Sequence, residues 1–295
     1  MKISGFTFVR NAVKYGYPLR ESVNSLLPLV DEMVIVAGDS DDDTNSLIES
    51  FNSPKIRIVH SVWDPELRSG GEVLAVETNK AIEATSPDAD WLFYLQADEV
   101  LHEQYYSVIR EAFEKYRNDR EVEGLLFHYN HFYGSYRFIA DGRKWYSKEI
   151  RVIRRDPAIR SYRDAQGFRK INGSKLKVKL VDAFVYHYGW VRNPVVMHSK
   201  VKDFGKFWNE DEAHDSWAEE FARKSDKFDY SVIDSVSLFE GTHPEVMKNL
   251  VEKENWSFNL DVKRKNFKNF KHRFLYFLWK KTGWRPFEYR NYKRI

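Results

Sequence analysis

The sequence contains no cysteine, which excludes disulfide bonds, zinc sites built from thiolates and a cysteine nucleophile. It also has no uninterrupted apolar run of about 18 residues, the length that a membrane-spanning helix needs. The first residues pass directly into an expected strand, without the apolar core of a secretion signal. We therefore expect a soluble, cytoplasmic protein that can lie peripherally on the inner face of a membrane.

Acidic and basic residues are unevenly distributed along the chain. The net charge is only +3, yet residues 262–295 hold 12 lysines or arginines and one acid, Glu288. The preceding residues are therefore net acidic, and the sequence describes an acidic body followed by a basic segment. An acidic body disfavours nucleic acid as a partner.

Apolar runs and helical patterns alternate along the first hundred residues. Expected strands lie at residues 2–9, 33–37, 56–59 and 91–95. Expected helices lie between them, at residues 18–27, 45–51 and 72–84. This alternation predicts an α/β fold with a doubly wound, mostly parallel sheet flanked by helices, in which several acid-bearing strand ends share one edge.

Two of these strands end in acidic turns. Residues 91–95 are continuously apolar, as in a strand buried on both faces, and lead into Gln96, Ala97, Asp98 and Glu99. Ligands of open α/β sheets bind beyond the carboxyl ends of the strands, which favours a cation or sugar site here. The alternative is a helix N-terminus, where the helix dipole favours acids such as Glu99. The same kind of alternative applies to the acidic turn at residues 39–43, which is either a ligand site or a solvated turn at the start of a helix.

These features together resemble a known enzyme family. A first strand that ends in an Asn turn, VAGDSDDDT, the helical Thr78-Asn79-Lys80 and DWLFYLQADEVL follow one another at suitable spacing over about residues 2–103. They resemble the nucleotide-sugar half of inverting family 2 glycosyltransferases, which have the GT-A fold, and in particular the lipopolysaccharide-core and cell-surface-glycan branch.

The resemblance implies a nucleotide-sugar donor and a divalent metal, Mn²⁺ or Mg²⁺. Asp98 falls on the second acid of the family's DxD motif and would bind the metal, whereas Gln96 stands at the first acid and contributes no charge. Asp39 lies one or two positions after the place of the family's base-recognising aspartate. The residues expected to contact the donor are Val9, Arg10, Asn11, Asp39, Asp42, Asn79, Lys80, Gln96, Ala97, Asp98 and Arg192.

The segment VYHYGWVR, residues 185–192, resembles the part of related enzymes in which a histidine after the last strand supplies a further metal ligand. The resemblance implies this role for His187, and a histidine beside a carboxylate would suit Mn²⁺ better than Mg²⁺. A purely structural histidine is the alternative.

An inverting transferase needs a base that takes the proton of the acceptor hydroxyl. The resemblance places this acid between the expected strand at 145–155 and the expected strand at 176–186. Asp164 is the first candidate and Glu149 the second. For Asp164 the alternative is a structural ion pair with Arg163 or Arg169.

The sequence predicts a GT-A domain over residues 1–194, with a nucleotide-sugar half (1–103) and an acceptor half (104–194). Residues 195–295 are expected to be helical, with helices at 195–208 and 215–224. In residues 266–281, Phe267, Phe270, Phe274, Phe277 and Leu278 recur at helical spacing among cations, which predicts an amphipathic helix. This helix either contacts an anionic membrane surface or docks on the body.

We therefore predict a glycosyltransferase that moves a sugar, with inversion, from a nucleotide-sugar to a glycan or lipid-linked acceptor, in cell-surface polysaccharide or lipopolysaccharide synthesis. One rival is a nucleotidyltransferase, which the absence of a Gly-rich basic loop after the first strand disfavours. The other is a non-catalytic nucleotide- or glycan-binding scaffold, which Gln96 in place of an acid favours.

Overall fold

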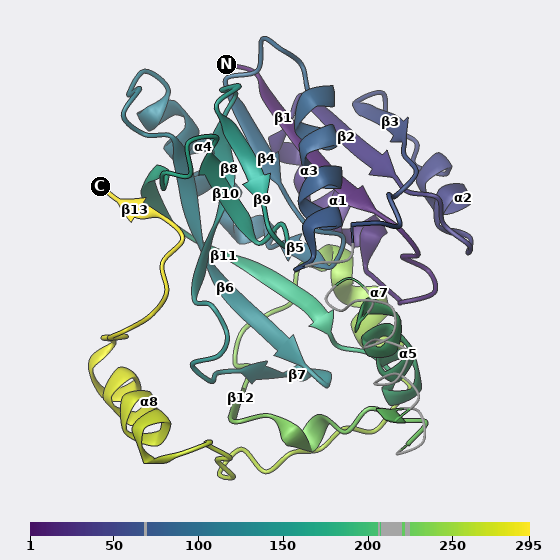
Figure 1. The fold of residues 1–295 in the computed structure, drawn as a ribbon, viewed down its shortest axis with the longest axis vertical. Helices are drawn as coiled ribbons and strands as arrows, with labels where there is room; N and C mark the ends of the chain where they lie inside the picture. The colour runs from purple at the N-terminus through teal and green to yellow at the C-terminus, as the bar shows by residue number, and fades with distance from the viewer. Residues whose placement is uncertain (68–69, 206, 208–219, 222–224) are drawn as a thin grey trace.

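The computed structural model describes residues 1–67, 70–205, 207, 220–221 and 225–295, and it has an α/β fold built on one large mixed sheet (Figure 1). The strands in chain order are β1 (Ile3–Val9), β2 (Glu32–Ala37), β3 (Ile56–His60), β4 (Trp91–Tyr94), β5 (Glu99–Leu101), β6 (Gly124–Tyr133), β7 (Ser135–Ala140), β8 (Lys148–Arg154), β9 (Ile159–Tyr162), β10 (Gly167–Lys170), β11 (Lys177–Trp190), β12 (Val236–Leu238) and β13 (Lys293–Arg294). The predicted α/β class is therefore confirmed.

The sheet has the order β12-β7-β6-β8-β4-β1-β2-β3. The four strands of the first half, β3, β2, β1 and β4, pair in parallel, as their alternation with helices predicts. The antiparallel β8 joins β4 to β6, and the long β11 pairs in parallel with β6. A separate two-stranded sheet consists of β9 and β10.

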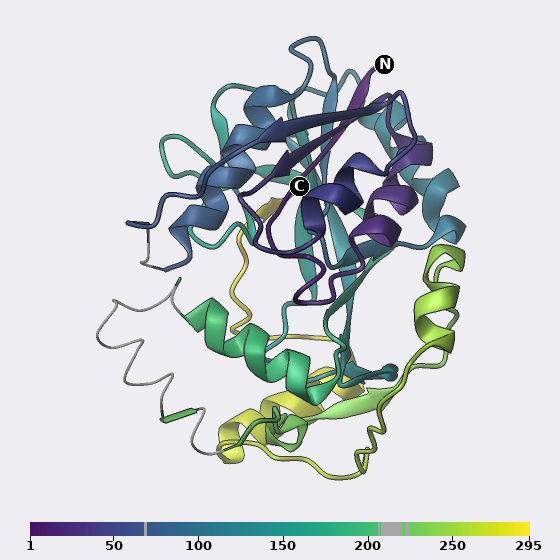
Figure 2. The same cartoon turned by 90° about the vertical axis from the view of Figure 1, so that its right-hand side faces the viewer.

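Helices cover both faces of the sheet (Figures 1 and 2). Those of the described chain are α1 (Leu19–Leu26), α2 (Thr44–Glu49), α3 (Glu72–Ala84), α4 (Tyr106–Tyr116), α5 (Pro194–Gly205), α7 (Lys248–Glu252) and α8 (Phe270–Thr282). Apolar side chains of α1, α2 and α4 form one core cluster, whereas those of α3 pack with the β9–β10 hairpin in the other. The expected 215–224 helix lies outside the described residues, apart from residues 220 and 221.

The central strand β4 shows why its sequence is continuously apolar. Trp91 and Phe93 point into the core cluster of α1 and α4, while Leu92 and Tyr94 point into the cluster of α3. All four side chains have no exposed surface. A strand covered on both faces has no position for a polar side chain until it ends, so the first polar residues mark the edge of the sheet.

Beyond β4 the chain turns through residues 96–98 and enters β5, where the sequence had left a choice between a ligand site and a helix N-terminus. Glu99 has neither role. It is fully buried and forms a bidentate ion pair with Arg151 of β8, with oxygen–nitrogen distances of 2.7 and 2.8 Å. The same carboxylate accepts hydrogen bonds from the hydroxyl of Tyr129, at 2.8 Å, and from the backbone N–H of Gln96, at 3.1 Å.

The antiparallel pairing of β5 with β11 places Glu99 opposite His187. The backbone N–H of Tyr188 also donates to the carbonyl oxygen of Asp98 over 2.8 Å. The turn after the central strand and the end of β11, which lie ninety residues apart in the sequence, are thereby fixed side by side.

Residues 195–295, expected to form a helical region, also extend the sheet. β12 pairs with β7, and β13 pairs with β11 near the C-terminus. Within the described ranges, no helix combines the length and the apolar character that crossing a bilayer requires.

We predict that Glu99→Gln destabilises the protein by about 3–5 kcal/mol, because the change leaves the guanidinium of Arg151 buried without its counter-ion. Urea unfolding followed by circular dichroism measures this change. The control is Glu121→Gln, which breaks an exposed pair with Lys177 and is expected to cost less than about 1 kcal/mol. Equal stability losses in the two variants would contradict the structural role of Glu99.

Candidate functional site

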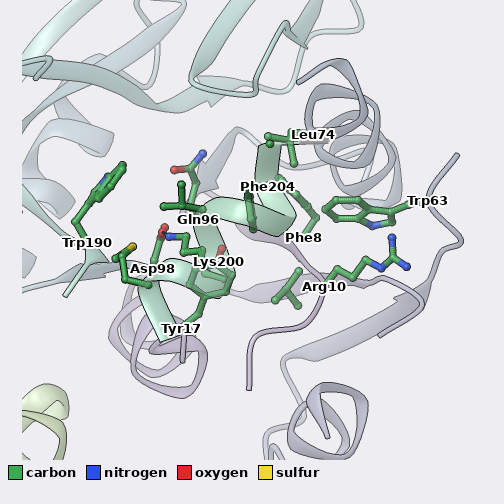
Figure 3. A pocket seen from close by; sticks show the side chains of 15 residues that line it. Phe8, Arg10, Tyr17, Trp63, Leu74, Gln96, Asp98, Trp190, Lys200 and Phe204 are labelled. Atoms are coloured by element: carbon green, nitrogen blue, oxygen red, sulfur yellow. Dashed lines mark ion pairs between the residues drawn. The ribbon is translucent and has the colours of Figure 1, made fainter. Parts of the chain in front are cut away.

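A cavity of about 450 Å³ opens at the carboxyl ends of β1 and β4 and is covered by one face of α5 (Figure 3). Asp98 and Lys200 lie at one end of it, and Trp63 and Arg10 lie at the other. Its lining consists of Phe8, Val9, Arg10, Tyr17, Trp63, Leu74, Gln96, Ala97, Asp98, Trp190, Met197, Lys200, Val201, Phe204 and Gly205. The volume is in the range of small-molecule sites.

Asp98 is surrounded by cationic and imidazole groups. Its Oδ2 atom lies 3.6 Å from Nε2 of His187 and 3.9 Å from Nζ of Lys200. Burial by itself would raise the pKa of Asp98, but His187, Lys200 and Arg192 outweigh it and hold that pKa well below the ordinary value. Asp98 is therefore an ionised carboxylate at neutral pH.

A second histidine, His131 of β6, determines which ring nitrogen of His187 donates to it and which one faces Asp98. Nε2 of His131 lies 2.8 Å from the carbonyl oxygen of Tyr146, which can only accept, so this nitrogen carries the proton. Burial, reinforced by His187, lowers the pKa of His131 well below its ordinary value, so the ring is neutral and its Nδ1 is an acceptor. Nδ1 of His187, 3.0 Å away, must then donate to it.

This arrangement commits Nδ1 of His187 to His131, so Nε2 is the ring nitrogen that faces the Asp98 carboxylate. Their separation of 3.6 Å is too long for a hydrogen bond. A carboxylate oxygen and an imidazole nitrogen that face each other in this way can bind one cation once that nitrogen carries no proton, and a histidine ligand is commonly oriented through its other ring nitrogen.

The space between the two groups is open because residue 189 is glycine. A methyl group on the α-carbon of Gly189 would lie 2.5 Å from Oδ2 of Asp98 and 2.6 Å from Nε2 of His187. Metal–ligand bonds to such atoms are about 2.0–2.2 Å long, so one cation can reach both atoms. The residues present therefore fit the divalent metal that the resemblance implies.

The protein supplies only part of a coordination shell. Across the described residues, no group of three or more His, Cys, Asp or Glu side chains could hold a metal ion. Gln96, in place of a second acid, lines the same cavity. A hard cation between Asp98 and His187 would thus take its remaining ligands from water or from a bound anion.

Two further cations border Asp98. Lys200 of α5, which the sequence analysis did not identify, donates to the carbonyl oxygen of Gly189 over 2.7 Å, and burial lowers its pKa to about 8. Arg192, predicted at the diphosphate, is buried and donates to the carbonyl oxygens of Tyr15 and Tyr188. Its Nη2 atom is buried without a hydrogen-bond partner in the described structure.

Aromatic rings form the opposite end of the cavity. Trp63, in the loop after β3, packs beside Phe8 with ring centroids 5.9 Å apart, and the guanidinium of Arg10 lies 5.5 Å from its ring. Trp63 is buried, and its Nε1 atom has no hydrogen-bond partner among the described residues. The apolar faces of these rings suit a flat heterocycle. No sequence pattern marked Trp63, because its position depends on the loop.

The predicted first-strand turn reaches the cavity through Val9 and Arg10. Asn11 adopts a left-handed backbone conformation with φ of 56°, and its side chain accepts a hydrogen bond from the backbone N–H of Asp41 at 2.9 Å. Asn11 therefore joins this turn to the acidic turn after β2 and is buried behind the cavity.

The acids of the turn after β2 form ion pairs and hydrogen bonds with other groups of the protein. Asp39 pairs with Arg10 at 3.2 Å and accepts from the backbone N–H of Trp63. Asp42 accepts from the backbone N–H groups of Lys14 and Thr44, so it orders both the turn and the start of α2. Neither acid is among the residues that line the cavity.

Two residues predicted on α3 make contacts within the protein. The side-chain amide of Asn79 exchanges two hydrogen bonds with the backbone of Ser161. Lys80 pairs with the buried Glu77 at 2.6 Å and donates to the hydroxyl of Ser61. These contacts fasten α3 to β9 and to the chain after β3.

Neither candidate base is among the residues that line the Asp98 cavity. Glu149 is buried in β8, and burial raises its pKa to about 8, so it holds a proton at neutral pH. Asp164 is partly exposed in the β9–β10 turn and lines a second cavity of about 530 Å³. It lies between Arg163 and Ala165, whose φ angles of 55° and 58° are unusual for residues with a side chain.

Comparisons with known proteins give only distant similarities. No family profile matches the chain, and no curated protein matches it. Among solved structures, S. aureus TarS is 14% identical with a TM-score of 0.40, and the match spans 76% of this chain but only 43% of TarS. The 1–349 fragment of TarS in complex with UDP-GlcNAc is 14% identical over 75% of this chain and 72% of that chain, with a TM-score of 0.41.

Two further solved structures show comparable similarity. The 4-diphosphocytidyl-2C-methyl-D-erythritol synthase of Anaerococcus prevotii is 11% identical over 69% of this chain and 94% of that chain, with a TM-score of 0.39. Glucosyl-3-phosphoglycerate synthase of Mycobacterium tuberculosis, in complex with Mn²⁺, UDP and phosphoglyceric acid, is 20% identical over 44% of this chain and 43% of that chain, with a TM-score of 0.31. Similarities at this level do not establish a family.

We predict that Gly189→Ala weakens Mn²⁺ binding by about tenfold or more, because the added methyl group occupies the space between Asp98 and His187. The electron paramagnetic resonance signal of free Mn²⁺, titrated with protein, measures the change. Gly241→Ala is the matched control, since the atoms nearest to its added methyl group belong to the side chain of Phe239, at 2.7 Å, and not to Asp98 or His187. Unchanged Mn²⁺ affinity in Gly189→Ala would remove this gap as the metal site.

Proposed function

We propose that this chain is an inverting glycosyltransferase that binds a nucleotide-sugar in the Asp98 cavity and transfers the sugar to a glycan or lipid-linked acceptor in cell-surface polysaccharide or lipopolysaccharide synthesis. The observation that carries the proposal is the open gap between Asp98 and His187 at the carboxyl end of the central strand, inside a cavity of ligand size. In this assignment residues 1–103 form the main part of the donor site and residues 104–194 face the acceptor, while His187, Arg192 and Lys200 of α5 join the donor site at the diphosphate end.

The ends of the cavity match the two ends of a nucleotide diphosphate. Phe8 and Trp63 would stack against the base, and Arg10 borders the same end. At the other end, Asp98 and His187 would hold a divalent ion, Mn²⁺ or Mg²⁺, which when bound supplies positive charge to the leaving diphosphate. Lys200 would add a donor there, and the buried Arg192 would add positive charge near Asp98.

The acceptor must lose its hydroxyl proton to a base, and the two candidates differ in protonation. Glu149 is buried and already protonated at neutral pH, so it has no free charge with which to accept a proton. Asp164 is reachable from solvent in an open cavity, on a turn whose neighbours carry backbone strain. Strained turns occur preferentially at functional sites, which favours Asp164 as the base.

The competing proposal is a non-catalytic binding protein, and Gln96 favours it because the turn carries one acid where the family pattern has two. Donor hydrolysis in the absence of acceptor separates an enzyme from a scaffold. A nucleotidyltransferase would instead release diphosphate from a nucleoside triphosphate, which the same assay distinguishes by product.

We predict that Asp98→Asn abolishes the Mn²⁺-dependent thermal stabilisation by the nucleotide-sugar, because the neutral amide no longer attracts the ion. Thermal shift across UDP-, GDP-, CMP- and dTDP-sugars, with and without Mn²⁺, first identifies the donor and then measures the loss. His187→Ala should weaken the same response less. Full metal-dependent stabilisation of Asp98→Asn would remove Asp98 from the donor site.

We predict that Asp164→Asn lowers turnover by about 10²- to 10⁴-fold with near-normal donor affinity, the usual range for loss of a general base. Steady-state kinetics together with donor titration measure the two quantities separately. Glu149→Gln serves as the comparison, because glutamine is uncharged, like the buried and protonated side chain of Glu149. Activity that survives Asp164→Asn but disappears in Glu149→Gln would exchange the two roles.

A further inference from the structure

The C-terminal helix α8 is attached to the body by one face only. Leu275 and Tyr276 are buried, and the hydroxyl of Tyr276 donates to the carboxylate of Asp141 over 2.9 Å. Lys280 pairs with the same carboxylate at 2.7 Å. α8 lies at the end of the molecule far from β3 and α2 (Figures 1 and 2). The sequence had left open a docked helix or a surface-binding helix, and the structure has a docked helix with a second, free face.

The free face of α8 carries a row of exposed aromatic rings. Phe270, Phe274 and Phe277 recur at helical spacing and are 80%, 55% and 49% exposed. Soluble proteins rarely place adjacent large apolar side chains in water without a partner. The row therefore points to something that covers it.

A neighbouring loop presents one more ring beside this row. Phe287 is 88% exposed and has a left-handed backbone conformation, with φ of 60°. Its flanking chain is anchored, because Arg285 donates to the carbonyl oxygen of Trp145 and Glu288 accepts from the hydroxyl of Ser147. Lys271 of α8 lies 5.8 Å from the Phe287 ring, so this loop and the first turn of α8 form one surface.

The exposed charged side chains within residues 262–295 are all cationic, and the acids beside the row, Asp141 and Glu240, belong to other elements and line a cavity with Phe277. The exposed cations of the segment include Lys268, Lys271, Arg273 and Lys281, and its one acid, Glu288, is largely buried and paired with Arg285. Aromatic side chains surrounded by lysine and arginine match the interface of an anionic bilayer, where rings enter the headgroup region and cations meet phosphates.

We infer that the exposed face of α8, together with the Phe287 loop, docks on the surface of an anionic lipid bilayer. This inference is independent of the proposed transferase reaction, since it concerns residues outside the Asp98 cavity. If both hold, docking would hold the enzyme beside a lipid-linked acceptor.

The test is co-sedimentation of the full chain, without donor or metal, with vesicles of phosphatidylglycerol and phosphatidylcholine. The parent protein should bind at low salt, and binding should weaken as salt rises, because surface charges are screened beyond about 8 Å at physiological ionic strength. The double variant Phe270→Ser/Phe274→Ser should bind at least about tenfold more weakly. Its melting temperature should change little, since the two rings are already 80% and 55% exposed.

Matched controls distinguish vesicle binding through this face from vesicle binding through exposed apolar or basic residues elsewhere on the surface. Ile171→Ser/Val232→Ser removes two exposed apolar side chains elsewhere and should bind like the parent. Lys268→Glu/Lys281→Glu should lose binding, whereas Lys115→Glu/Arg117→Glu, with the same change in net charge on α4 and its end, should retain most of it.

Three results would overturn the inference. The first is parent-level vesicle binding by Phe270→Ser/Phe274→Ser. The second is equal binding of the parent to vesicles of phosphatidylcholine alone. The third is absence of vesicle binding together with a dimer, measured by light scattering, that the phenylalanine variant abolishes, because the face would then be an interface between two copies of the chain.

Discussion

The carboxylate of Glu99 is the group on which the arrangement of the site depends. It is a buried charge, and four donors from three separate parts of the chain satisfy it: two from Arg151, one from Tyr129 and one from the backbone of Gln96. A buried carboxylate is tolerated only when it is paired and hydrogen-bonded in this way. The turn between β4 and β5 is therefore held in one conformation, and that conformation turns Asp98 toward β11.

Once this turn is fixed, the pairing of β5 with β11 brings His187 to Asp98, and the contact with His131 turns its Nε2 atom to that side. Gly189 keeps the space between Nε2 and the Asp98 carboxylate open. The result is an anionic carboxylate with an imidazole, Lys200 and Arg192 around it, at the end of a cavity whose other end is aromatic. This polarity, charged at one end and flat and apolar at the other, is what supports a nucleotide diphosphate as the ligand.

The parts of this account that depend on short-range pattern could be predicted from the sequence. The alternation of apolar runs and helices predicted the first half of the sheet, and the abrupt end of the apolar run at Leu95 located the turn that carries Asp98. The VYHYGWVR segment directed attention to His187, which the structure brings to within 3.6 Å of Asp98, and its role as a metal ligand stays a prediction.

Contacts between distant parts of the chain could not be predicted from the sequence. Nothing near Glu99 in the sequence indicates that Arg151 neutralises it, and an acid beside an acid therefore looked like a second ligand or a helix start. Asn79, Lys80 and Asp42 are of the polar types that a ligand site needs, and the sequence did not indicate the hydrogen bonds and the ion pair that they form within the protein. Lys200 enters the site only because α5 folds back over the strand ends, which no local pattern encodes.

The central claim is that Asp98 and His187 form one cation site, and the most direct test is X-ray diffraction from crystals soaked in Mn²⁺, recorded at the manganese absorption edge. The account predicts an anomalous peak between Oδ2 of Asp98 and Nε2 of His187, within about 2.3 Å of both atoms. A peak bound only to other side chains, with the space beside Gly189 empty, would contradict it.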